Sequence, residues 1–181
     1  MSDRYSIAWH QHRFAAWAAA TAASASPLCR FTVQQGFAIL EASGFTVALS
    51  SPDTLPSPAR LDQRHHAWRM DVITAALQNQ LQFTHGLAAK LINCYLKSRF
   101  VCAGHHQHPN VQALHPPIDA LLLQRLAAGN VGGHTANWRQ YHHWRWSKFT
   151  STQYQTVIDT IRLSYPGQPL WTIEEHWQGH Q

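Results

Sequence analysis

The stretch FTHGLAAKLINCYLK, Phe83–Lys97, decides how this chain is expected to fold. Its apolar residues recur at helical spacing, which predicts a helix that runs through Lys97. Gly86 lies at the start of this helix, where a short hairpin over residues 80–86 ends. Lys90 lies on the first turns, among mostly apolar neighbours. We therefore expect a partly buried lysine behind a glycine-containing turn.

Helical patterns also dominate on both sides of this stretch. The sequence predicts further helices over Ala8–Ala25, Phe31–Ala42, Pro58–Gln78, Ile118–Ala128, a segment that starts at Ser151, and Thr172–Trp177. One apolar stripe from Leu61 to Ala76 is expected to face the core. Proline and glycine mark loops at Ser50–Arg60 and Gly129–Gly133. With no internal repeat and no long linker, we predict an all-α protein with a single compact domain over residues 1–181.

Composition limits the partners and the compartment. The chain has 181 residues, enough for one well-buried domain, and 45% of them are hydrophobic. Lysine and arginine outnumber the acidic residues by 14 to 9, which favours an anionic partner. Cys29, Cys94 and Cys102 form no CxxC pair, so we expect a reducing, cytoplasmic compartment. No apolar run of about 18 residues is present, so no membrane contact is expected.

A second charged residue follows a pair of prolines. In HPPID, His115–Asp119, the prolines deliver Asp119 to the start of the next predicted helix. Earlier in the chain, four residues match the pattern Gly-x-Gly-x-Lys-x-x-Asn, with an alanine in place of the second glycine: Gly86, Ala88, Lys90 and Asn93. Here the sequence resembles the helix-hairpin-helix superfamily of DNA glycosylases, in which this hairpin is followed by an aspartate that begins a later helix.

The resemblance implies a helix-hairpin-helix element and an enzyme that flips a base out of double-stranded DNA and cleaves its glycosidic bond. Cleavage builds positive charge on the sugar, which a carboxylate stabilises. A deprotonated lysine can instead attack the sugar carbon and form a Schiff base, which leads on to strand cleavage. We therefore assign Lys90 as the candidate nucleophile and Asp119 as the electrostatic or general-base carboxylate. No cofactor is required, and three cysteines cannot supply the usual four ligands of an iron–sulfur cluster.

A second resemblance covers more of the chain, from Thr84 to Trp177. It rests on THGLAAKLINCYLK, LHPPIDALLL, WSKF, QYQTVIDTIR and PLWTIEEHW, taken in this order. These segments are similar to motifs of little-characterised bacterial proteins that are assigned an 8-oxoguanine-glycosylase-like fold. Members of that group occur in contexts of phage defence or DNA processing. The resemblance implies a damaged base or a hypermodified phage base as the substrate, and leaves open which.

The interval between Lys90 and Asp119 is longer than the family usually shows, and we assign the excess to an insertion loop over residues 103–114. This loop is expected to lie over or beside the site. It carries His105, His106 and His108, close to Cys102. Two interpretations remain open, a zinc site or contacts with DNA that strengthen when the imidazoles are protonated.

The stretch WRQYHHWRWSKF, Trp138–Phe149, alternates aromatic and basic residues. This composition fits a nucleic-acid surface and equally a tryptophan-rich core seam. We expect helix-start amides over residues 86–89 to hold a phosphate. The residues expected to contact DNA are His85, Gly86, Ala88, Lys97, Arg145 and Lys148, and those expected at the base pocket are Trp146 and His115. Trp171 and Trp177 are expected to pin the last helix.

Two other functions fit the sequence. In the first, a helical DNA-binding module grips phosphate through the hairpin without catalysis, and Lys90 and Asp119 are ordinary surface charges. The second, weaker alternative is a histidine-rich metal-binding protein. The position of Lys90 relative to Asp119 separates catalysis from simple binding, because catalysis requires both side chains in one cleft.

Overall fold

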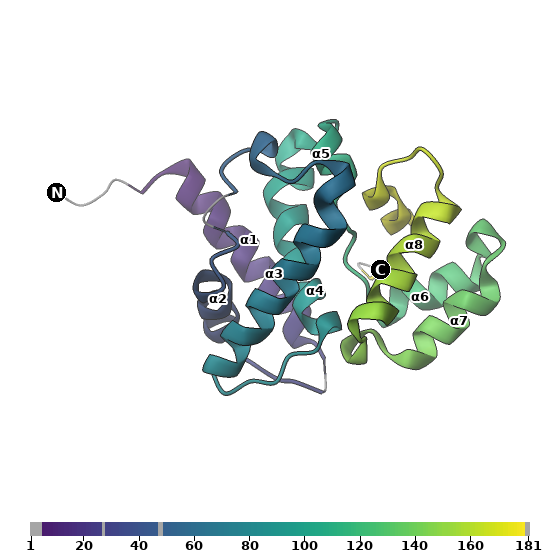
Figure 1. The fold of residues 1–181 in the computed structure, drawn as a ribbon, viewed down its shortest axis with the longest axis horizontal. Helices are drawn as coiled ribbons and strands as arrows, with labels where there is room; N and C mark the ends of the chain where they lie inside the picture. Colours follow the sequence, from purple (N-terminus) through teal and green to yellow (C-terminus); the bar gives the residue numbers. More distant parts are fainter. Residues whose placement is uncertain (1–4, 27, 47–48, 180–181) are drawn as a thin grey trace.

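The computed structural model describes residues 5–26, 28–46 and 49–179, and every regular element in these residues is a helix (Figure 1). The longer α-helices are α1 (Ile7–Ser24), α2 (Val33–Ala42), α3 (Pro58–Gln78), α4 (His85–Leu96), α6 (Ala120–Ala128), α7 (Thr135–Trp144) and α8 (Ser151–Ser164). The predicted all-α class is therefore confirmed. The sequence interpretation missed α7, because its alternation of aromatic and basic residues was considered for composition rather than for helical spacing.

Short helical segments connect these elements. They are the 3₁₀ turns η1 (Pro52–Thr54), η3 (Val131–Gly133), η4 (Trp146–Lys148) and η5 (Leu170–His176), the π-helical η2 (Lys97–His105), and the one-turn α5 (Pro109–Gln112). The predicted insertion over residues 103–114 is thus partly helical. It begins at the end of η2, where Gly104 adopts a φ of +95° that favours glycine. No helix of the described residues is long and apolar enough to cross a membrane.

The helices form two groups, each with its own core (Figure 1). One group contains α1 to α5, and the other contains α6 to α8 together with η5. Helix α4 lies between them: its residues 86–93 are all buried, and Ala89 packs into the second core. A helix that is apolar on every side is stable only when it is surrounded by protein. Phe83–Lys97 therefore supplies the central helix of the fold.

Helix α1 buries an alanine face. The buried residues are Ala15, Ala16, Ala19, Ala20 and Ala23, whereas Phe14 and Trp17 remain 58% and 52% exposed. These small side chains let neighbouring backbones approach closely: a Cβ on Gly36 of α2 would lie 2.6 Å from the Cβ of Ala20. The aromatic residues of this helix therefore face outward, although they share its helical spacing.

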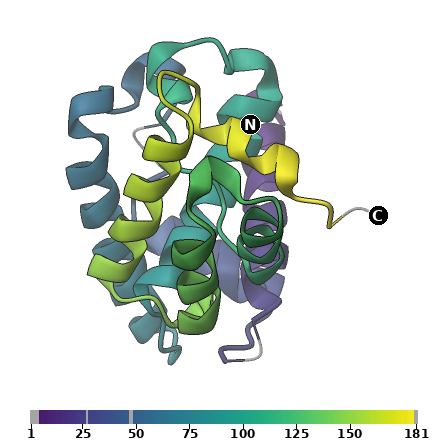
Figure 2. The ribbon, with the colours of Figure 1, turned by 90° about the vertical axis from the view of Figure 1, so that its right-hand side faces the viewer.

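The apolar stripe predicted on α3 is buried as expected. Its members Leu61, His65, Trp68, Val72, Ala75 and Ala76 are at most 2% exposed. On the other side of the molecule, η5 crosses beside the helices of the second group (Figure 2, yellow). It packs against α6 and α8. The C-terminal segment thereby comes close to the first turn of α6, which begins directly after Asp119.

Candidate functional site

Lys90 and Asp119 form an ion pair between the two helix groups. The Lys90 Nζ donates to Asp119 Oδ2 at 3.0 Å, and the side chains are only 8% and 20% exposed. Buried ions are costly unless they are paired and hydrogen-bonded. The chain brings together two charged residues that are 29 positions apart in the sequence. The structure therefore brings together the lysine and the aspartate that the sequence singled out.

Asp119 is fixed by three donors. Its Oδ1 accepts from the Leu122 N–H at 2.8 Å, which makes it the N-cap of α6. Its Oδ2 accepts from Lys90 and also from the Trp177 indole N–H at 2.9 Å. Burial favours the neutral acid, but the charge of Lys90 and these hydrogen bonds outweigh it and lower the pKa of Asp119 below its ordinary value. Asp119 is thus held as an oriented carboxylate.

The turn that carries Asp119 is anchored to α4 by Asn93. The Asn93 amide donates to the carbonyl oxygen of Pro116 at 2.9 Å and to the Tyr154 hydroxyl at 2.9 Å. Its Oδ1 lies 2.7 Å from His65 Nε2. Asn93, the last residue of the hairpin pattern, therefore ties the lysine helix to the aspartate turn. This explains physically why the lysine, the asparagine and the aspartate belong together.

A cavity of about 210 Å³ borders the ion pair. Its lining consists of Ala18, Ala22, Lys90, Cys94, Lys97, Ser98, Pro117, Asp119, Glu174 and Trp177. Helix α1, helix α4, the proline turn and the C-terminal segment each contribute. Lys90 and Asp119 therefore line one cavity.

Trp146 lies on another side of the pair. Lys90 Nζ is 5.7 Å from the centre of its ring, within the range of a cation–π contact. The preceding residue, Arg145, has a backbone φ of +64°, which is strained for any residue other than glycine. This turn ends α7 and sets the direction of Trp146. The residue predicted at the pocket boundary thus lies beside the lysine.

The expected grip of the hairpin amides on a phosphate is wrong for this structure. The Gly86 N–H donates to the Phe149 carbonyl oxygen at 3.3 Å, and the Leu87 and Ala88 amides bond to Thr84. Ala88 has no exposed surface. A Cβ on Gly86 would lie 1.8 Å from the carbonyl oxygen of Trp146. The glycine therefore admits η4 against α4, and neither Gly86 nor Ala88 is placed to contact DNA.

The prediction that His115 lies at the base pocket is also wrong. Its side chain has no exposed surface, so it does not line a base pocket. The Nδ1 lies 3.0 Å from the Tyr154 hydroxyl, and Nε2 lies 2.8 Å from Asp62 Oδ1. Asp62 in turn accepts two hydrogen bonds from Arg162, at 2.6 and 2.8 Å. His115 therefore supports the turn that ends at Asp119 instead of meeting a substrate.

Lys97 was expected to contact DNA, but its ammonium is paired with Glu174, whose side chain is only 15% exposed. Burial raises the pKa of Glu174, although the charges of Lys97 and Lys90 oppose this. Sequence reasoning missed Glu174, because a glutamate in a short terminal helix gave no sign of burial. It also gave Trp177 only a packing role, whereas its indole bonds to Asp119.

The remaining predicted DNA contacts lie at the surface or near it. Arg145 and Lys148 are exposed, and His85 is partly exposed, with its ring stacked 5.8 Å from that of His66. A hollow of about 430 Å³ lies beside Trp146, and Arg145, His142 and His143 contribute to its lining. One arginine and two histidines therefore border the hollow beside the tryptophan that contacts Lys90.

The histidines of the insertion point to different partners. His106 packs edge-on against Trp171 at 6.0 Å, and His108 lies 3.2 Å from Asp53. Among the described residues, no group of three or more His, Cys, Asp or Glu side chains is arranged to hold a metal ion. His106 and Cys102 instead line a cavity of about 530 Å³ that shares Lys97 and Glu174 with the site. Of the insertion, His106 therefore comes close to the site, whereas His108 lies away from it against η1.

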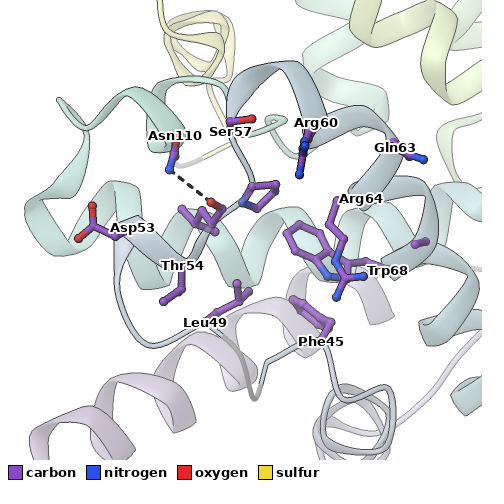
Figure 3. A pocket seen from close by; sticks show the side chains of 13 residues that line it. Phe45, Leu49, Asp53, Thr54, Ser57, Arg60, Gln63, Arg64, Trp68 and Asn110 are labelled. Atoms are coloured by element: carbon purple, nitrogen blue, oxygen red, sulfur yellow. Dashed lines mark hydrogen bonds between the residues drawn. The ribbon is translucent and has the colours of Figure 1, made fainter.

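The largest cavity described, about 750 Å³, lies elsewhere (Figure 3). Its apolar floor includes Phe45, Leu49 and Trp68, and two arginines, Arg60 and Arg64, stand on its α3 side (Figure 3). Neither Lys90 nor Asp119 contributes to this cavity. We place the candidate site at the 210 Å³ cavity, because the buried ion pair of Lys90 and Asp119 lines it.

Comparison of the chain with known protein families, with characterised proteins and with solved structures finds no match.

Proposed function

We propose that this protein is a DNA glycosylase of the helix-hairpin-helix type, which acts as a cytoplasmic monomer on double-stranded DNA. The observation that carries the proposal is the 3.0 Å contact of Lys90 and Asp119 at the wall of one cavity. Two tryptophans flank this pair: Trp146 lies over Lys90, and Trp177 bonds to Asp119. Aromatic faces beside a charged pair suit an extruded base and its sugar.

In the proposed reaction, Lys90 attacks C1′ of the extruded nucleotide and the glycosidic bond breaks. Asp119, kept ionised by its donors, stabilises the positive charge that develops on the sugar. The attached sugar then opens to a Schiff base, which leads to strand cleavage by elimination. The substrate class is a damaged base or a hypermodified base of phage DNA, and a defence role follows from the latter.

Borohydride trapping tests the proposal directly, because it fixes a Schiff base to the protein. The chain has three lysines, Lys90, Lys97 and Lys148, so three single substitutions to alanine show whether one of these side chains is the trapped amine. We expect Lys90→Ala to abolish trapping on DNA with an abasic site, and Lys148→Ala to retain it at protein concentrations that saturate its weaker complex with DNA. Asp119→Asn should slow base release about 100-fold or more in single-turnover assays.

The substrates for release are duplexes with oxidised purines and duplexes from phages with hypermodified pyrimidines. Trapping that persists in Lys90→Ala would contradict the assignment of the nucleophile. If the protein binds these duplexes but neither releases a base nor is trapped, it is a non-catalytic DNA-binding module.

A further inference from the structure

Glu174 is a second buried carboxyl at the same cavity. It lies on η5, far from Asp119 in the sequence, and both residues line the 210 Å³ cavity together with Lys90. Its side chain is 15% exposed and is paired with Lys97, which lies seven residues after Lys90 on the continuation of α4. Two lysines and two carboxylates therefore meet at one cavity, and only Lys90 and Asp119 have a role so far.

The surroundings of Glu174 are mixed in charge. The titratable groups that line its two adjoining cavities are Lys90, Cys94, Lys97, Cys102, His106, Asp119 and Glu175. The two lysines favour the ionised form of Glu174, whereas burial and the charge of Asp119 favour the protonated form. Burial prevails, and the pKa of Glu174 is raised above its ordinary value.

The two carboxyls thus respond oppositely to their environment. The pKa of Asp119 is lowered, because an ammonium and hydrogen-bond donors hold its charge, and the pKa of Glu174 is raised by burial. Where two carboxyls of one site are shifted apart, the lowered one remains a fixed charge and the raised one exchanges protons. Its lowered pKa makes Asp119 a good electrostatic partner of Lys90 but a poor acceptor of the Lys90 proton.

We propose that Glu174 is the proton-transfer residue of this site, which takes a proton from the Lys90 ammonium and passes it to the departing base. The inference rests on the proposed function. Its geometric basis is that Glu174, Lys90 and Asp119 line one cavity, with Glu174 held there by Lys97.

The proposed step conserves protons and electrons. The Lys90 ammonium gives one proton to the Glu174 carboxylate, which leaves a neutral amine and a carboxylic acid. The amine lone pair forms a bond to C1′, and the C1′–N bond breaks with its electron pair on the base. The base nitrogen then takes the proton of Glu174. A neutral base leaves, Glu174 is again a carboxylate, and the positive charge stays on the Lys90 nitrogen.

The test compares Glu174→Gln with Glu175→Gln, since Glu175 is the exposed neighbour on the same turn. We expect Glu174→Gln to slow single-turnover release of a poor leaving base about 100-fold or more, and to slow release of a base with a stable anion far less. Glu175→Gln should behave as the wild type. If Glu174→Gln slows the release of both bases equally, Glu174 is only a structural partner of Lys97, and the inference is overturned.

The pH profile gives an independent measure. Glu174 must be ionised to accept the proton, so base release should fall as the pH drops through its raised pKa, and this acid limb should disappear in Glu174→Gln. Lys97→Met retains the carboxyl but removes a charge that lowers its pKa, so the acid limb should move to higher pH. An unmoved limb in Lys97→Met would contradict the inference even if Glu174→Gln fails to fold. If the wild-type protein neither releases a base nor is trapped on abasic DNA, the proposed function fails, and the role of Glu174 fails with it.

Discussion

At the scale of single residues, Asp119 combines structural and chemical roles. It caps α6 through Oδ1 and holds Lys90 and the Trp177 indole through Oδ2. A capping carboxylate belongs at a helix N-terminus in any protein. Asp119 differs from an ordinary capping residue, because its second oxygen bonds to Lys90, a lysine that is only 7% exposed. The two roles can be separated, since asparagine keeps the cap but not the charge.

We expect Asp119→Asn to destabilise the fold by about 3 kcal/mol, because Lys90 would lose its counter-ion in a buried place. Asp119→Ala should cost about 1 kcal/mol more, since the cap is lost too. Urea unfolding measures both, with the exposed Asp71→Asn as a control. Equal stability of the alanine and asparagine variants would show that the cap contributes nothing.

The same residue gives a pH dependence. The pKa of Asp119 is lowered in the folded state, so its contribution to stability is present above its unfolded pKa of about 3.9. That contribution is lost as the pH falls towards the folded pKa. The stability difference between the wild type and Asp119→Asn should therefore shrink on acidification, as measured by urea unfolding from pH 6 downward. A difference that stays constant would contradict the ion pair.

At the scale of elements, the contact of α4 with η4 sets the position of Trp146. Gly86 allows this contact, because its missing side chain leaves room for the Trp146 carbonyl group. The Gly86 N–H and the Thr84 hydroxyl both donate to backbone carbonyl groups of residues 147–149. The first turn of α4 therefore serves as a docking point for another segment of the chain.

We expect Gly86→Ala to cost at least about 1–3 kcal/mol, because a methyl group would force two backbones apart. It should also displace Trp146 from Lys90 and lower the yield of borohydride trapping. Gly129→Ala is the matched control: its Cβ would meet no atom closer than 3.4 Å. Thermal unfolding and trapping on abasic DNA measure both effects. A fully stable Gly86→Ala protein would contradict the close approach.

At the scale of the whole molecule, the site lies where two helix groups meet, and exposed cations stand on the α7 and η4 side of it. The chain carries +5 with its histidines counted as neutral. Arg145 and Lys148 are exposed next to Trp146, whereas Arg60 and Arg64 lie at the largest cavity, on α3 in the other group. These two cationic regions are therefore the candidates for the proposed DNA surface.

The proposed site favours the region of Arg145 and Lys148 as the DNA surface. Arg145→Gln and Lys148→Gln should each weaken binding to duplexes of any sequence and reduce the slope of log K against log salt by about 1. Arg60→Gln should change neither quantity. Fluorescence anisotropy over a series of salt concentrations decides between the regions. A reduced slope in Arg60→Gln alone would move the DNA surface to the largest cavity.

The sequence by itself determined the helical class, most helix positions and the two residues of the central pair. Periodic apolar residues and cap residues act locally, so α3, α4 and α8 could be predicted from spacing alone. The order of Lys90, Asn93 and Asp119 likewise pointed to residues that the fold brings together.

Only the tertiary structure decided which polar groups remain available. Burial and hydrogen-bond partners depend on segments far apart in the chain, and these removed His115, Ala88 and the hairpin amides from the candidate contacts. The same long-range packing brought Glu174 and Trp177 to Asp119. The sequence thus determined which side chains carry charge, and the packing of α4 between two cores decided which of these charges meet.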